Sequence, residues 1–231
     1  MSDSLTSALA FLLDAPLQSW GTASKFNHRE TESHPSKSGI LGLIAAAIGI
    51  DSRDSDDTGG MDLLTSLRVH CVRLIKSQDQ LVHRLSDYHT VENTRKASGV
   101  MNKDAVITRR TYLTDSSFLC ILEGDASQLV DIRSALENPK WGIWFGRKCN
   151  LPAMPISPMM AKDTNSAQTA LLEKLNHWRS SQKQSPCTMH TRWTEPKQDK
   201  QDGDYFLMDL PVSFSHRTYK SRSIRRTEPT P

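Results

Sequence analysis

Residues 35–50 read PSKSGILGLIAAAIGI, and this apolar stretch decides how the chain begins to fold. Ser36 suits the N-cap of a helix, because its hydroxyl can accept a hydrogen bond from a free amide of the first turn. Gly49 can end the helix in the left-handed conformation that other residues avoid. The run is interrupted by Gly42 and is too short to span a bilayer. We therefore expect an apolar helix of a soluble protein here.

The segments around this helix predict strands. Residues 9–13 are apolar and predict a buried strand that ends at Asp14 and Pro16. Residues 67–75 and 80–85 are rich in β-branched and apolar side chains, so the polar residues between them predict the turn of a hairpin.

A second strand–helix–strand unit follows further along the chain. Residues 112–122 predict a strand with Phe118, Cys120 and Leu122 on one face, and residues 126–137 have helical spacing of apolar residues. The last strand of the unit is expected near residues 143–145. The combined order of elements is typical of an α+β, ferredoxin-like (RRM-like) domain that carries an insertion.

The insertion is expected at about residues 87–111. It contains few large apolar residues, and Gly99 lies near its middle. Six basic residues fall in or beside it: Arg84, Arg95, Lys96, Lys103, Arg109 and Arg110. A segment of this kind cannot pack into a core, so it should project as an arm or a long hairpin.

The C-terminal third predicts a smaller, β-rich part. Three prolines interrupt residues 152–158, a helix is expected at 167–178, and strands are expected near 188–193 and 205–214. We therefore divide the chain into a ferredoxin-like domain, 1–150, and a β-rich region, 151–231. The tail 216–226 carries five basic residues around Tyr219. This tail suits either RNA contact or an exposed edge strand that its charges protect.

Composition excludes several classes of protein. The four cysteines form no CxxC pair, so neither a zinc site nor a disulfide framework is expected, and scattered thiols fit a reducing cytoplasm. The net charge is +3, and residues 51–62 hold five acids against Arg53, so the remainder is more basic. A basic bias is compatible with a polyanionic partner.

Two residues suggest chemistry. Lys37 places a cation in the first turn of a helix, where it opposes the macrodipole unless an anion is bound there; the alternative is a side chain in solvent. His89, next to Tyr88, could act as a general base in metal-independent RNA cleavage. Alternatively, the two residues stack on RNA or cap the arm. No HxxxH or HExxH motif is present, so no metal site is expected. No GxSxG motif indicates a nucleophilic serine.

Four segments together resemble the Cas-five (CasD) family. Any one of them is weak evidence, but four in order at consistent spacing are strong. The first is LLDAPLQSWG at 12–21, and the second is the helix at 35–50. The third has two parts, DYHTV at 87–91 and ITRRTYLTD at 107–115, and the fourth is GRKC at 146–149. The resemblance resumes in DLPVSF at 209–214. The Tyr-His pair and the length look most like the type I-E branch, which is found in Cascade.

This resemblance implies a RAMP domain whose thumb hairpin hooks the 5′ handle of CRISPR RNA (crRNA) in cytoplasmic antiviral defence. The thumb would contact a Cas-seven backbone subunit, and the large PAM-reading subunit would lie alongside. Target DNA would be met only indirectly, and no membrane would be involved. In the I-E branch this subunit is a non-catalytic cap. In the I-C branch a Tyr, Lys and His set cuts precursor crRNA, so such an endoribonuclease, with Tyr88, His89 and Lys25, is the main alternative. A pure protein adaptor is the third.

The expected RNA contacts follow from these interpretations. They are Lys25, Lys37, Ser38, Tyr88, His89, Arg95, Lys96, Arg109, Arg110, Arg147 and Lys148. We expect no catalytic residue, no metal and no cofactor.

Overall fold

The computed structural model describes residues 6–24, 26–51, 60–76, 83–196, 203–213 and 216–228. Their elements are, in order, β1 (Thr6–Gln18), β2 (His28–Arg29), α1 (Lys37–Ile48), α3 (Gly60–Thr65), β3 (Arg68–Ile75), β4 (His83–Val91), β5 (Val106–Asp125), α4 (Ala126–Glu137), β6 (Met159–Ala161), α5 (Thr164–Ser181), β7 (Thr188–Thr194), β8 (Tyr205–Ser213) and β9 (Thr218–Thr227). None of the helices in these ranges is long and apolar enough to cross a membrane.

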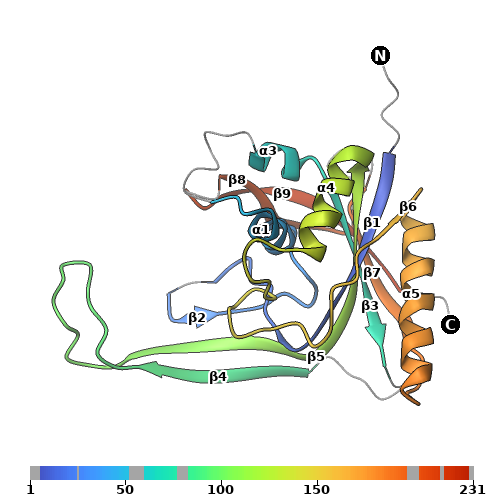
Figure 1. Ribbon diagram of the computed structural model, residues 1–231. Coiled ribbons are helices and arrows are strands. Elements are labelled where there is room, and N and C mark those ends of the chain that lie inside the picture. Colours follow the sequence, from blue (N-terminus) through green and yellow to red (C-terminus); the bar gives the residue numbers. More distant parts are fainter. Residues whose placement is uncertain are drawn as a thin grey trace.

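The described strands form one sheet in the order β6-β1-β5-β3-β7-β9-β8, and β2 and β4 also pair with β5. The first four strands of this order, β6-β1-β5-β3, are antiparallel neighbours, and α1 and α4 provide the connections that return the chain to them. Helices α1 and α4 lie on one side of this part of the sheet, and α5 lies on the other (Figure 1).

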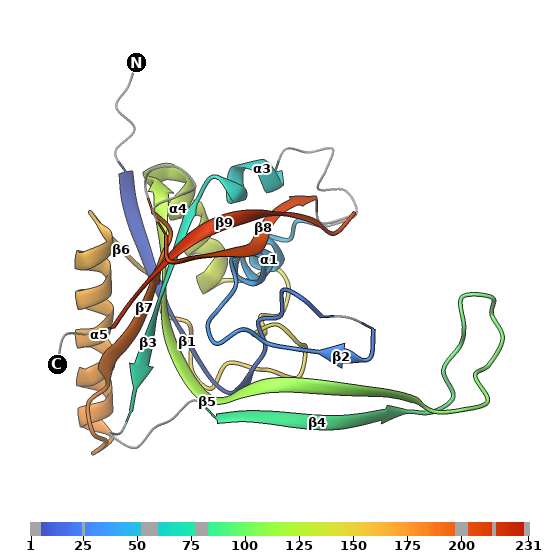
Figure 2. The same ribbon diagram turned by 180° about the vertical axis from the view of Figure 1, so that it is seen from behind.

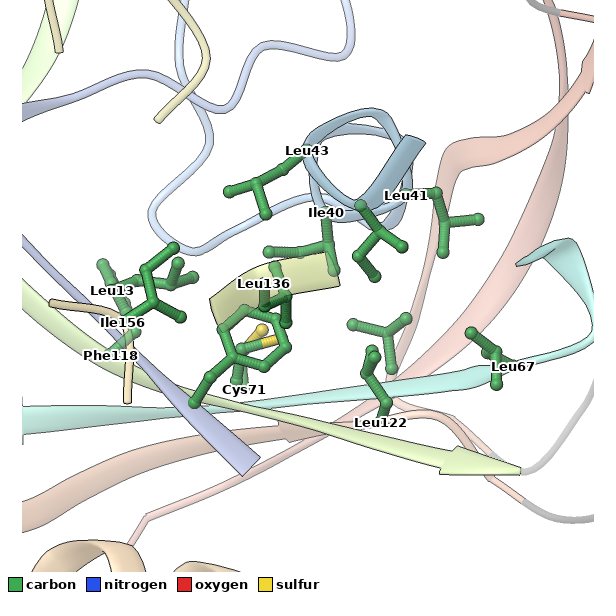
Figure 3. Packing of buried hydrophobic residues seen from close by; sticks show 14 of the residues in the cluster. Leu13, Ile40, Leu41, Leu43, Leu67, Cys71, Phe118, Leu122, Leu136 and Ile156 are labelled. Carbon is green, nitrogen blue, oxygen red and sulfur yellow. The ribbon is translucent and has the colours of Figure 1, made fainter. Parts of the chain in front are cut away.

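Two apolar cores lie on the two sides of the sheet. Leu9, Phe11 and Leu13 of β1 pack toward α1 and α4, whereas Ala8 and Leu12 pack toward α5. Figure 3 shows residues of the first core, with β-strand side chains meeting the apolar face of α1. Because both faces of β1 are covered, its sequence is a continuous apolar run and not an alternating one.

Helices α1 and α4 follow the sequence closely. Ser36 caps α1 by accepting from the Gly39 amide at 3.4 Å, and Gly49 ends the helix with φ of 87°. Helix α4 spans the predicted residues and buries Leu129, Ile132 and Leu136. Both predictions are confirmed, because local capping and spacing alone determine these two elements.

Three predictions about strands are wrong. Strand β1 continues past Pro16 to Gln18. The pairing with β5 skips Pro16, which has no N–H to donate, and resumes at Leu17. On β5 the skipped residue is Asp115, whose φ of 46° lies in the left-handed region. Strands β3 and β4 do not pair with each other, because both pair with β5. The turn expected between them lies outside the described residues.

The third error concerns residues 143–145, which form a loop and not a strand. Phe145 accepts from the Ser19 amide at 3.0 Å and donates to Asn150 at 2.8 Å, so its backbone groups are used across a tight turn. The strand that pairs with β1 on this side is β6, which lies after residue 150. The division at residue 150 stays a prediction.

The C-terminal tail is also not an edge strand. Strand β9 lies between β7 and β8, so β8 is at the edge. Arg222 of β9 is buried, while Lys220, Arg225 and Arg226 are exposed. The tail is therefore part of the sheet, and one of its cations belongs to the interior.

A buried ionic network fastens the C-terminal hairpin to α1. Asp209 of β8 is fully buried; it accepts from the backbone amide of Lys37 at 2.6 Å and from Arg222 at 2.6 and 2.9 Å. Glu195, just after β7, accepts from the Lys37 ammonium at 2.9 and 3.1 Å and from the Val69 amide at 3.1 Å. Burial lowers the pKa of Lys37, and Glu195 opposes that shift. The network thus joins α1, β3, β8 and β9.

His34 is buried beside this network. Its ring stacks on Trp193 with centroids 4.7 Å apart, and Tyr205 meets it edge-on. Burial, followed by the nearby Arg222, lowers the pKa of His34 from 6.5 to about 3, so the imidazole is neutral in the folded protein.

The network predicts a large effect of Asp209→Ala. This substitution leaves the Arg222 guanidinium buried without its main partner, so we expect the free energy of unfolding to fall by about 3–5 kcal/mol. Urea unfolding followed by circular dichroism measures it. Asp131→Ala, at an exposed position of α4, is the control and should change stability by less than about 0.5 kcal/mol. A loss below about 1 kcal/mol for Asp209→Ala would show that the network is dispensable.

His34 predicts a pH dependence of stability. Its pKa is lowered on folding, so the unfolded chain binds the extra proton below pH 6.5 and stability falls as the pH decreases toward the folded value. Between pH 8 and 5, wild type should lose about 2 kcal/mol more than His34→Gln. Urea unfolding of both proteins at the two pH values measures this difference. An equal loss in both proteins would mean that His34 does not titrate on unfolding.

Candidate nucleic-acid interface

A two-stranded arm projects from the body of the protein. Strand β4 pairs with the first half of β5, from His83 opposite Thr114 to Val91 opposite Val106. Figures 1 and 2 show the hairpin extending away from the helices and from the rest of the sheet. The long hairpin that the sequence predicts is therefore present, and it begins at residue 83. Its side chains are mostly exposed, since a two-stranded ribbon has no core of its own.

A basic and aromatic row crosses one face of the arm. Tyr88 of β4 lies directly opposite Arg109 of β5, and Arg109 is in turn paired with His28 of β2. Paired residues share a face of a sheet, and all three are exposed. A cation beside an aromatic ring suits a phosphate and a stacked base of single-stranded RNA. We call these three residues the Tyr88 row.

The opposite face of the arm carries a second row, formed by Asp87, Arg110 and Arg29 in the same register. Arg110 donates to the Thr108 hydroxyl at 3.1 Å. His89 is on this face, opposite Thr108, because successive residues of a strand point to opposite sides. Tyr88 and His89 are thus separated by the ribbon, and the structure does not bring them together.

His89 has one unusual feature. Its Nδ1 atom is buried and has no hydrogen-bond partner among the described residues. Asp87 lies two residues away on the same face, opposite Arg110. No hydrogen bond joins His89 to an acid among the described residues, so they hold no preassembled acid–base pair for a cleavage reaction.

The tip of the arm is a separate region. Arg95 forms an isolated bridge with Met101, and a turn follows in which Gly99, at φ 82°, donates to the Lys96 carbonyl at 2.9 Å. Arg95 and Lys96 are exposed there. Six residues separate Arg95 from Tyr88, and β4 ends at Val91 before the tip begins. The tip and the Tyr88 row therefore lie on different parts of the arm.

Arg147 fixes the base of the arm. Its guanidinium donates to the carbonyl oxygens of Thr111 at 2.9 Å and Arg29 at 2.8 Å, and it lies 4.3 Å from the centroid of the Tyr112 ring. Gly146 precedes it at φ 92°, and a Cβ there would lie 1.7 Å from the Ser19 carbonyl oxygen. Arg147 is therefore a clamp between three segments. Lys148 is exposed and lies 5.6 Å from the Trp144 ring.

A cavity of about 300 Å³ opens at the start of α1, and we call it the α1 cavity. It brings Ser38 and Arg147 together with residues from three other segments, including Gly21, Arg29 and Tyr219. The surrounding backbone is close: a Cβ on Gly39 would lie 2.8 Å from the Trp20 ring. The start of α1 and two arginines line this opening, which favours an anion, although Glu30 lines it too and the Lys37 and Gly39 amides are already bound within the protein.

Lys37 is a correction to the expected set of RNA contacts. Its side chain is buried and bound to Glu195, so it does not face the α1 cavity. The anion beside this cation is an internal carboxylate and not a bound ligand, and the alternative of a side chain in solvent is also wrong, because Lys37 is buried. Lys25 lies outside the described residues.

Sequence reasoning missed two members of the candidate interface, His28 and Arg29, and did not place Tyr219 at the α1 cavity. The two residues of β2 reach β5 by a parallel pairing with a short, polar segment. Hydrophobic periodicity cannot detect so short a strand. Tyr219 reaches the α1 cavity only because the β8–β9 hairpin folds back over α1. Among the residues described, no group of three or more His, Cys, Asp or Glu side chains could hold a metal ion.

Known proteins resemble this chain over most of its length. It is 30% identical over 149 residues to the CRISPR system Cascade subunit CasD of Escherichia coli (strain K12), and the matched part covers 62% of this chain and 66% of CasD, slightly less than two thirds of that relative. A structure described as the crystal structure of a Cas protein has a TM-score of 0.64 at 26% identity, over 96% of this chain and 94% of that one.

A chain of a CRISPR RNA-guided surveillance complex has a TM-score of 0.68 at 24% identity, over 96% of this chain and 90% of that one, which shows a common fold. The sequence model of the family described as CRISPR-associated protein (Cas_Cas5) matches residues 8–227. Because this match spans both the arm and the C-terminal hairpin, the chain belongs to that CRISPR-associated family.

Proposed function

We propose that this protein is a non-catalytic, RNA-holding subunit of a Cascade-type CRISPR complex, and that it caps the 5′ handle of crRNA. The observation that carries the proposal is the exposed arm with the Tyr88 row across one face. The 30% identity to a Cascade subunit supports the assignment to this kind of complex. The strand order β6-β1-β5-β3 supports a ferredoxin-like (RRM-like) RAMP domain, in which the arm is the thumb.

The energetics of the arm favour RNA as its partner. Between residues 84 and 110 it carries six basic residues against three acids. Each base stacked on an aromatic side chain contributes about 1–3 kcal/mol, and each phosphate neutralised by Arg releases counterions. A single-stranded handle offers both splayed bases and phosphates. Sequence choice in the target would then be made by guide pairing, so target DNA would be met only indirectly.

Protein partners would cover the rest of the arm. The tip exposes Val100 and Met101 beside Arg95 and Lys96. An exposed apolar pair rimmed by charge is suited to a protein neighbour. We propose that a Cas-seven backbone subunit contacts the tip and that the large PAM-reading subunit packs against the body, so that this chain links them.

Removing both arginines of the arm tests the proposal. In the Arg109→Gln/Arg110→Gln variant, we expect at least tenfold weaker binding to a single-stranded handle RNA and a salt dependence lower by about 1.4 in log–log slope, since two phosphate contacts are lost. Fluorescence anisotropy from 50 to 300 mM salt measures both. Pull-down of the co-expressed complex, with sequencing of RNA 5′ ends, shows whether assembly is lost.

The matched control is Arg133→Gln/Lys174→Gln, which removes two charges from helices α4 and α5. It should leave RNA affinity and assembly within twofold of wild type. Unchanged assembly and affinity in the arm variant at physiological salt would rule out the arm as the RNA contact.

The endoribonuclease alternative has its own test. Because Tyr88 and His89 lie on opposite faces of the arm, we expect the purified protein to leave a CRISPR repeat RNA intact in EDTA over hours. Denaturing gel electrophoresis detects any product. A specific cut that disappears in His89→Ala, but persists in His83→Ala, would establish the nuclease and overturn the non-catalytic assignment.

A further inference from the structure

A second cavity, of about 510 Å³, lies on the same side of the sheet as α1, and we call it the β3–β7 cavity. Its walls come from the segment before α1 and from strands β3, β7, β8 and β9. It shares no lining residue with the α1 cavity. Its volume is in the range of small-molecule sites, so it has room for more than an isolated ion.

Arg73 of β3 is the first sign that the cavity takes a ligand. Only 7% of the residue is exposed, yet its guanidinium forms no hydrogen bond or ion pair with any described residue. Burial lowers the pKa of Arg73, the direction expected for a cation that lacks a counter-charge. The side chain lines the cavity, and none of its nitrogen atoms is fully enclosed by protein, so the unpaired guanidinium can be reached from the cavity. An unpaired cation at the wall of a cavity suits an anionic partner.

His34 is the second sign, and it comes from a different segment. Only 2% of the residue is exposed, and neither Nδ1 nor Nε2 has a partner among the described residues. The ring cannot simply turn away, because it is stacked on Trp193 at an interplanar angle of 7°. A neutral imidazole offers one donor and one acceptor. Buried groups left without partners usually meet a water, an ion or a ligand.

The charge around the cavity favours an anion. Arg226, which is paired with Glu228, lines it. Arg222, which is held by Asp209, lies near enough to His34 to lower the pKa of the imidazole further. Glu32 is the one acidic side chain among the lining residues, and its carboxylate accepts a hydrogen bond from Thr22. A guanidinium with its fork free binds phosphate oxygens in a bidentate manner.

We propose that the β3–β7 cavity binds the phosphate group of a nucleotide, with Arg73 as the main donor and the His34 N–H as a second donor. The phosphate belongs either to bound RNA, in which case the inference rests on the proposed function, or to a free mononucleotide. The cavity volume leaves space for the sugar that carries the phosphate.

The test compares Arg73→Gln with wild type, using two probes on the full chain. The probes are a fluorescein-labelled twelve-nucleotide single-stranded RNA, read by anisotropy, and adenosine 5′-monophosphate, read by calorimetry. If the phosphate comes from RNA, the affinity for RNA falls at least tenfold and the mononucleotide does not bind. If it comes from a free nucleotide, wild type binds the mononucleotide, and that affinity falls tenfold while RNA binding is unchanged. No effect on either probe overturns the proposal.

Further variants separate binding from folding. Arg73→Gln removes an unpaired charge, so its melting temperature should equal or exceed that of wild type. Arg73→Lys keeps the charge without the fork, so its affinity should be intermediate. Lower melting temperatures in both variants, with equal losses of affinity, would assign Arg73 to packing and overturn the proposal. Arg133→Gln, on α4, is the control for loss of one charge.

The outcome is distinguishable from failure of the proposed function. RNA binding that is lost in the Arg109→Gln/Arg110→Gln variant but kept in Arg73→Gln, with no mononucleotide bound, leaves the RNA-holding role intact and rejects the cavity. If wild type binds no RNA, the RNA-holding role fails, and the mononucleotide titration alone decides the cavity.

Discussion

Two carboxylates at the start of helix α1, the buried Asp209 and the partly buried Glu195, hold the C-terminal half of the protein against this helix. They arrive from segments far along the chain, and each holds a cation of the protein itself, Lys37 or Arg222. Removing one partner from such a set leaves a desolvated charge, so the four groups are present together or not at all. The bonds of Asp209 to Lys37 and Arg222 hold the β8–β9 hairpin against α1. This position brings Tyr219 to the lining of the α1 cavity.

The charged residues of the arm, in contrast to those of the network, are mostly exposed, as are most of its other side chains. Its base is joined to the body by the pairing of β5 with β1 and β2, by the Arg147 clamp and by a hydrogen bond from Thr111 to Glu30. A two-stranded ribbon of this length gains little from burial. Its exposed cations and rings are accessible to a partner, whereas Lys37 and Arg222 of the network are held inside the fold. Charge of the same sign has two different roles within one chain, and burial distinguishes them.

The sequence alone predicts what local chemistry determines. The cap at Ser36, the end at Gly49 and the spacing of Leu129, Ile132 and Leu136 place two helices correctly. The lack of core residues near Gly99 predicts the hairpin. Pairings between distant segments could not be predicted in this way. The sequences of β3 and β4 resemble a hairpin, but both strands pair with β5. Residues 143–145 resemble a strand but form a loop. At the site, Lys37 is misassigned because its carboxylate partner lies 158 positions away, beyond the reach of any local pattern.

The linings of the two cavities approach each other along residues 30–36. His34 lines the β3–β7 cavity and Ser36 the α1 cavity, with Pro35 between them, and Glu32 and Glu30 line the same two cavities with Thr31 between them. A proline fixes its own φ and restricts the residue before it. Because φ of Pro35 is fixed, fewer backbone rotations are left to absorb a shift of His34 before it reaches the first turn of α1. Ser36 caps that turn, so an anion bound beside His34 would act on the start of α1, which lines the other cavity. Occupancy of the two cavities is thus expected to be coupled through the backbone of residues 34–36.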